Sequence, residues 1–181
     1  MRVVFCFDQL AIQVEDIDFL NPKIADEPDV RERGARIELR PVETADAPGG
    51  SIYSSQTVES GLGLCRLDFL ESEPHKRDRM HWHPAMVAGE PRTRTFDKEL
   101  SADPIGWLRA RLNDGARFLN DAGVSDTTPY DRDIRMMAEL ADDVVAQVER
   151  VLARARESLG VGTLPTAVRL ELDAGDRRRV R

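Results

Sequence analysis

Two histidines, His81 and His83, are the residues of this 181-residue chain whose types and spacing best suit metal chemistry. In an extended backbone, residues i and i+2 point to the same side, so both imidazole rings can approach one ion. Pro84 follows directly and favours an extended His83, because a proline restricts the residue before it. Trp82 would then point the other way, toward the core. The spacing therefore predicts half of a metal site on an extended segment.

A metal site needs at least a third ligand, and the surrounding sequence offers histidine and carboxylate candidates. The ligands we expect are His81, His83, His75, Glu71 and Glu73, with Asp78 and Glu90 also nearby. Histidine combined with carboxylate suits a divalent transition metal such as zinc, and also iron, nickel or manganese. An open coordination position would make the site hydrolytic or oxidative.

The alternative is that the His-x-His pair carries no metal. Such pairs also occur in solvated loops or as hydrogen-bonded histidines. The spacing does not match a cupin motif, since Glu90 comes too late, and position 85 is Ala where a histidine triad needs a third His. The sequence contains no HExxH, Walker A or Gly-x-Ser-x-Gly pattern. It therefore identifies no catalytic residue and no substrate, and whether the protein is an enzyme stays open.

The elements that must position these histidines fall into two halves. Strand-like patterns cover residues 2–14, 36–42, 51–58 and 61–71, and a last one lies near 168–172. Their short connections favour an antiparallel sheet of about four to six strands, drawn from residues 1–90 and 165–173. This indicates an α+β fold in which helices cover one face of the sheet.

Two helices are expected after the strands, near 104–120 and 129–159. The second is the longer, and an apolar stripe runs along it through Ile134, Met137, Ala141, Val144, Val148, Leu152, Ala155 and Leu159. Such a long stripe exceeds what a small sheet needs. We therefore expect Val144, Val148 and Leu152 to be covered either by the core or by a second copy, as a homodimer formed through the 129–159 helix.

The whole chain, residues 1–181, is expected to form one domain. Residues 73–98 look like an irregular connection that holds every histidine of the protein, and long connections often carry function. Residues 176–181 look like a flexible charged tail.

The charge balance limits the class of partner. The formal net charge is −7, and an acidic chain lacks the basic face that nucleic-acid binding requires. No secretory signal, membrane span or disulfide framework is recognisable, so we expect a cytoplasmic protein without a membrane partner. Any small-molecule ligand is left unknown.

Several segments together resemble an uncharacterised actinobacterial protein family, a domain of unknown function. They are 69–74, 79–84 (Arg-Met-His-Trp-His-Pro), 96–97 and 103–107. The resemblance implies no activity and no site residues.

The sequence therefore leaves three functions open. The first is a small metal-binding domain or metal-dependent enzyme built on His81 and His83. The second is a non-enzymatic homo-oligomeric interaction protein with no metal. The third is an anion pocket that uses His75, Lys76, Arg77 and Arg79.

Overall fold

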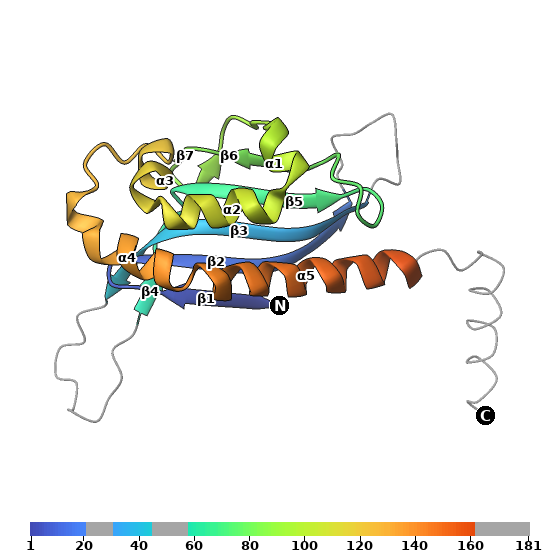
Figure 1. Ribbon diagram of the computed structural model, residues 1–181, viewed down its shortest axis with the longest axis horizontal. Coiled ribbons are helices and arrows are strands. Elements are labelled where there is room, and N and C mark those ends of the chain that lie inside the picture. Colours follow the sequence, from blue (N-terminus) through green and yellow to red (C-terminus); the bar gives the residue numbers. More distant parts are fainter. Residues whose placement is uncertain (21–30, 45–57, 162–181) are drawn as a thin grey trace, which may run out of the picture.

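The computed structural model describes residues 1–20, 31–44 and 58–161 and shows a sheet covered by helices on one face (Figure 1). The strands of the main sheet are β1 (Arg2–Cys6), β2 (Leu10–Leu20), β3 (Arg31–Thr44), β4 (Val58–Ser60), β5 (Cys65–Glu71) and β6 (His81–His83). A separate two-stranded ribbon consists of β7 (Met86–Val87) and β8 (Glu90–Pro91). The predicted α+β class is confirmed, and so is the predicted antiparallel sheet of about four to six strands, which has six.

The main sheet runs in the order β1-β2-β3-β5-β6, with β4 paired to the end of β3. All its pairings are antiparallel. The strand expected over 2–14 is a hairpin, because the chain reverses between Cys6 and Leu10. Residues 165–173 and 176–181, the expected last strand and charged tail, lie outside the described residues.

The helices follow the sheet in sequence. They are α1 (Lys98–Ala102), α2 (Pro104–Asn113), α3 (Gly115–Asp121), the 3₁₀ turn η1 (Thr128–Tyr130), α4 (Asp131–Glu139) and α5 (Ala141–Val161). The expectation of two continuous helices was wrong in this respect. The first breaks at Asp114, whose side chain accepts a hydrogen bond from the Arg117 N–H and so starts a new helix. The second breaks at Leu140.

The connection expected over 73–98 was also interpreted wrongly as irregular. It contains β6, the outermost strand of the main sheet, and the β7–β8 ribbon. The backbone of Trp82 additionally exchanges two hydrogen bonds with that of Thr95. His81 and His83 therefore lie on a strand of the main sheet, as their alternating spacing with Trp82 indicates.

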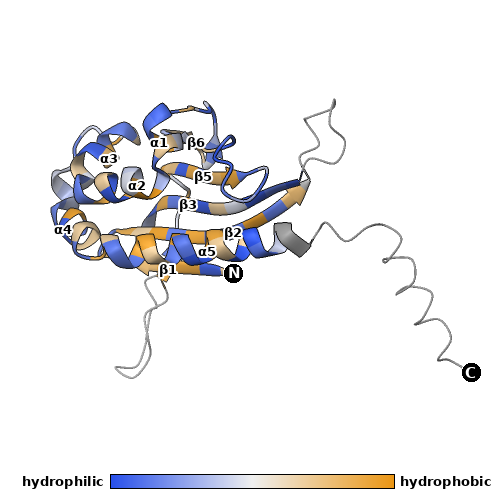
Figure 2. Ribbon diagram, turned by 45° about the vertical axis from the view of Figure 1, so that its right-hand side comes forward, coloured by the Kyte–Doolittle hydropathy of each residue, from blue (hydrophilic) through white to orange (hydrophobic). Residues whose placement is uncertain are grey.

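One face of the sheet forms the core with the helices, and α5 packs on β2 and β3. Alternate strand residues point into this core, among them Ile12, Ile37, Leu67 and Trp82. Figure 2 shows the resulting alternation of hydrophobic and hydrophilic residues along β3 and β5. The predicted position of Trp82 in the core is confirmed.

The apolar stripe of the long helix is used within the same chain. Val144 and Val148 are 0% exposed and Leu152 is 3% exposed, all in the common core cluster. The core interpretation of the stripe is therefore confirmed. The homodimer through the 129–159 helix stays a prediction. The apolar stripe no longer supports it, because Val144, Val148 and Leu152 are buried within the same chain.

The opposite face of the sheet carries polar residues in rows that cross the strands. One row contains Arg2, Glu15, Arg36, Asp68 and His81, which are successive register partners from β1 to β6. The first four residues of this row alternate in charge and form ion pairs at 2.7 Å (Arg2–Glu15), 3.9 Å (Glu15–Arg36) and 2.8 Å (Arg36–Asp68). Directly opposed charges stabilise a sheet. The row ends at the first histidine of the pair.

Candidate metal centre

Three buried side chains meet at the β5–β6 edge of the polar face. In the antiparallel register, Asp68 lies directly opposite His81, and Arg66 lies opposite His83. Asp68 and His81 are each 2% exposed and His83 is 4% exposed. Burial of two imidazoles and a carboxylate is costly unless each polar atom has a partner.

The Nδ1 atom of each histidine contacts a backbone carbonyl, which fixes the orientation of the ring. Nδ1 of His81 lies 2.8 Å from the carbonyl oxygen of Arg79, and Nδ1 of His83 lies 2.9 Å from that of Thr93. A carbonyl oxygen only accepts hydrogen bonds, so each Nδ1 carries the proton and donates it. In the neutral ring, Nε2 then has a free lone pair. This is how ligand histidines are commonly oriented, and it matches the backbone or carboxylate acceptors that we expect behind a metal site.

The two Nε2 atoms point toward the same carboxylate. Asp68 Oδ2 lies 3.5 Å from Nε2 of His81 and 3.8 Å from Nε2 of His83. All three ligand atoms lie within 4.8 Å of one another. Two ligands of a tetrahedral zinc ion, at about 2.0–2.1 Å from it, are about 3.3 Å apart. The group is thus slightly wider than a metal-bound triad, and a small inward movement of the side chains would close it.

Neither Nε2 atom has a hydrogen-bond partner, although both are shielded from solvent. A lone pair facing a carboxylate is electrostatically unfavourable, because both groups are acceptors. A cation between them would remove this conflict.

The surrounding charges and burial keep Asp68 and His83 in the protonation states that can bind a metal ion. Burial alone would raise the pKa of the Asp68 carboxyl, but the positive charges of the Arg36 and Arg66 guanidinium groups outweigh this effect. The pKa of Asp68 therefore lies well below its usual range. Burial lowers the pKa of His83 to about 4, and the charge of Arg66 acts in the same direction. At neutral pH, Asp68 is ionised and His83 is neutral, as metal ligation requires.

The other expected ligands lie elsewhere. Glu71 is buried but accepts two hydrogen bonds from Arg156, at 2.6 and 2.9 Å, and one from the backbone N–H of His75. Glu73 is exposed and lies 3.5 Å from Lys76. His75 itself is exposed and has a positive φ of 67°. Glu71, Glu73 and His75 are not part of the group formed by His81 and His83.

Sequence reasoning missed Asp68, which lies 13 residues before His81. The available signal was the alternation of residues 65–69, which places Asp68 on the face opposite Cys65, Leu67 and Phe69. Choosing it as a ligand also required the strand register, which the sequence does not contain. Two residues of the alternative anion pocket already have partners: Lys76 pairs with Glu73 and Asp78, and Arg77 donates to the Ala102 carbonyl.

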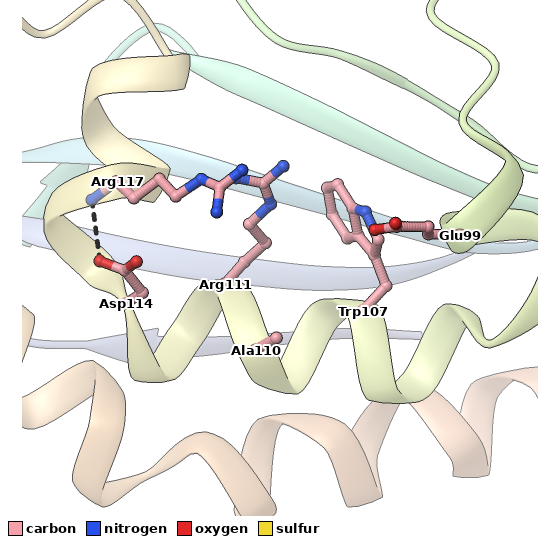
Figure 3. Close-up of a pocket in the computed structure, with 6 residues that line it drawn as sticks. All are labelled: Glu99, Trp107, Ala110, Arg111, Asp114 and Arg117. Atoms are coloured by element: carbon pink, nitrogen blue, oxygen red, sulfur yellow. Dashed lines mark hydrogen bonds between the residues drawn. The ribbon is translucent and has the colours of Figure 1, made fainter.

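A separate hollow lies on the helical side and is lined by Glu99, Trp107, Ala110, Arg111, Asp114 and Arg117 (Figure 3). The Arg111 guanidinium lies 4.6 Å from the Trp107 ring and 5.4 Å from the Trp82 ring. It also pairs with Asp121. The charge of Arg111 is thus already compensated, and its stacking supports β6 from the core side.

Comparison with family models, curated proteins and solved structures finds no match to this chain. The resemblance to an uncharacterised family therefore stays a prediction. Among the described residues, no helix is both long and apolar enough to cross a membrane.

Proposed function

We propose that this protein is a metal-binding domain that holds one divalent transition metal ion through Asp68, His81 and His83. The observation that carries the proposal is the pair of buried, unpartnered Nε2 atoms at 3.5 and 3.8 Å from one carboxylate oxygen. Two unpartnered imidazole nitrogens that face one carboxylate oxygen suit a cation. Two imidazoles and one carboxylate suit zinc or ferrous iron, with zinc as the ion expected first.

Three protein ligands leave at least one coordination position of such an ion for an external ligand. This is the arrangement of catalytic rather than structural zinc sites. A metal in this position would act as a Lewis acid or lower the pKa of a bound water. Asp68 would supply the negative charge, while the carbonyl groups of Arg79 and Thr93 would hold the two rings in orientation.

Cobalt(II) titration of the metal-free, untagged protein tests the proposal directly. We expect one equivalent to bind with the intense visible absorption of a low-symmetry site, and zinc to displace it. Elemental analysis of protein purified without a tag or chelator should find one metal per chain. Binding that the double variant His81→Ala/His83→Ala retains would refute the assignment, and so would failure of cobalt and zinc to bind the wild type.

A further inference from the structure

One donor beside the proposed centre stays without an acceptor. Arg66 is the direct cross-strand partner of His83, and its side chain is 17% exposed. Its Nε lies 3.1 Å from Asp68 Oδ2, yet this buried N–H makes no hydrogen bond. A metal ion would occupy both imidazole nitrogens but would leave the Arg66 N–H unpaired. An oxygen atom bound to the metal would accept it.

The charges around the centre favour an anionic oxygen ligand. Asp68 contributes one negative charge between the guanidinium groups of Arg36 and Arg66. Glu15 and Glu38, the cross-strand neighbours of Arg36 and Arg66, do not add net negative charge, because Glu15 also pairs with Arg2 and Glu38 pairs with Arg40. A divalent ion added to this cluster would leave an excess of positive charge. An anion on the metal would offset it.

The rim of the centre supplies a further cation and an apolar surface. Trp82 and Thr95 are bridge partners, so alternation places Arg94 and Phe96 on the same face as the two histidines. Arg94 is exposed and contributes to the positive field at Arg66. The Phe96 ring is 62% exposed and its centroid lies 5.5 Å from that of His81.

We infer that the metal centre takes an oxyanion, the carboxylate or phosphate-type group of a small molecule, as its external ligand, with Arg66 donating a hydrogen bond to it. This inference rests on the proposed metal site. Arg66 suits the role because a guanidinium group forms directional, charge-assisted bonds to such oxygens. The two Nε2 atoms are shielded from solvent, so the ligand must enter past a rim side chain. Phe96, which is exposed and packed on His81, is the side chain that it would displace.

The experiment measures cobalt(II) affinity of the metal-free protein in a non-coordinating buffer, alone and with 10 mM acetate or 10 mM methylphosphonate. We expect at least one anion to tighten cobalt binding about tenfold or more and to alter the visible spectrum. The anion that does so identifies the ligand as a carboxylate or as a phosphate type. The same series is run on Arg66→Gln and on Arg109→Gln. Arg109 is a matched control because it also loses one positive charge but lies on α2, paired with Asp142.

The Arg66→Gln variant should lose the anion effect, whereas Arg109→Gln should keep it. Cobalt binding that neither anion tightens in the wild type would overturn the inference and leave the metal site standing. An anion effect that persists in folded Arg66→Gln would overturn the role of Arg66. No cobalt binding under any condition would overturn the metal site and the inference together. The wild-type series tests the oxyanion even where the Arg66 variant fails to fold.

Discussion

Asp68 on β5 and His81 on β6 are direct partners in the antiparallel register, and Asp68 Oδ2 lies 3.5 Å from Nε2 of His81. This cross-strand pair joins the ladder of ion pairs on the polar face to the histidine pair at the sheet edge. The ladder fixes Asp68 from one side through Arg36 Nε, at 2.8 Å. The backbone carbonyls of Arg79 and Thr93 fix the two rings from the other side. The three proposed metal ligands are thus held in place by Arg36, Arg79 and Thr93, which do not themselves bind the ion.

The first prediction separates the proposed ligands from the other candidates. Single variants Asp68→Asn and His81→Ala should each weaken cobalt(II) binding by more than about 100-fold, since losing a ligand exceeds the 10–100-fold cost of losing an outer partner. His75→Ala and Glu73→Gln should leave the affinity unchanged, because both side chains are exposed and outside the group. Absorption titrations at pH 7 check this, with circular dichroism as the folding control. Equal loss in His75→Ala would contradict the assigned ligand set.

The second prediction concerns pH and the metal-free protein. The pKa of His83 falls from its ordinary value of 6.5 to about 4 on folding. Between these values the unfolded chain binds the extra proton and the folded chain does not. Stability should therefore fall as pH decreases from about 6.5 to about 4, by up to about 3 kcal/mol.

Urea unfolding at a series of pH values measures this slope. His83→Gln should flatten it in that window, because glutamine does not titrate. His75→Ala is the control for the loss of a histidine, because it removes an exposed imidazole and leaves His83 in place. The same slope in His83→Gln would show that another group causes the pH dependence.

The third prediction concerns Glu71, which connects β5 to the long helix. Glu71 is 2% exposed. Its carboxylate accepts hydrogen bonds from Nε and Nη2 of Arg156 on α5. Glu71→Gln keeps the shape but leaves Arg156 without its counter-charge, so we expect a loss of about 1–3 kcal/mol in unfolding free energy. Glu73→Gln, at an exposed ion pair, should change it by less than about 0.5 kcal/mol. Equal denaturation midpoints for the two variants would disprove the role of the buried pair.

The fourth prediction concerns Asp133, which is 0% exposed on α4. One oxygen of its carboxylate accepts hydrogen bonds from three backbone N–H groups, those of Asp8, Gln9 and Leu10, at 2.8–3.0 Å. It therefore holds the β1–β2 turn against the helices. Asp133→Ala would leave these N–H groups unpaired, and we expect it to cost about 2–4 kcal/mol. Asp143→Ala, at an exposed helix position, should cost less than about 0.5 kcal/mol. Thermal and urea unfolding measure the difference. An unfolding free energy of Asp133→Ala equal to that of the wild type would rule out the proposed role of this contact.

The local patterns of the sequence determined much of the architecture. Alternation in 36–42 and 61–71 predicts strands with one buried face, because side chains in a strand point to opposite sides in turn. The same rule places His81 and His83 together with Trp82 opposite, as the structure has them. The apolar period of the last long helix predicts its buried face at Val144, Val148 and Leu152. These features depend only on neighbours within a few residues.

Only the tertiary structure decided the third member of the site. Proximity in sequence favoured Glu71, Glu73 and His75, but the register of β5 against β6 brings Asp68 opposite His81. Glu71 instead accepts hydrogen bonds from Arg156 on α5. Register arises from the packing of whole strands on the core, and a shift by one residue would exchange the two faces of β5. The sequence predicts the apolar stripe of the long helix but not what covers it. The packing of α5 on β2 and β3 shows that the chain's own sheet covers the stripe.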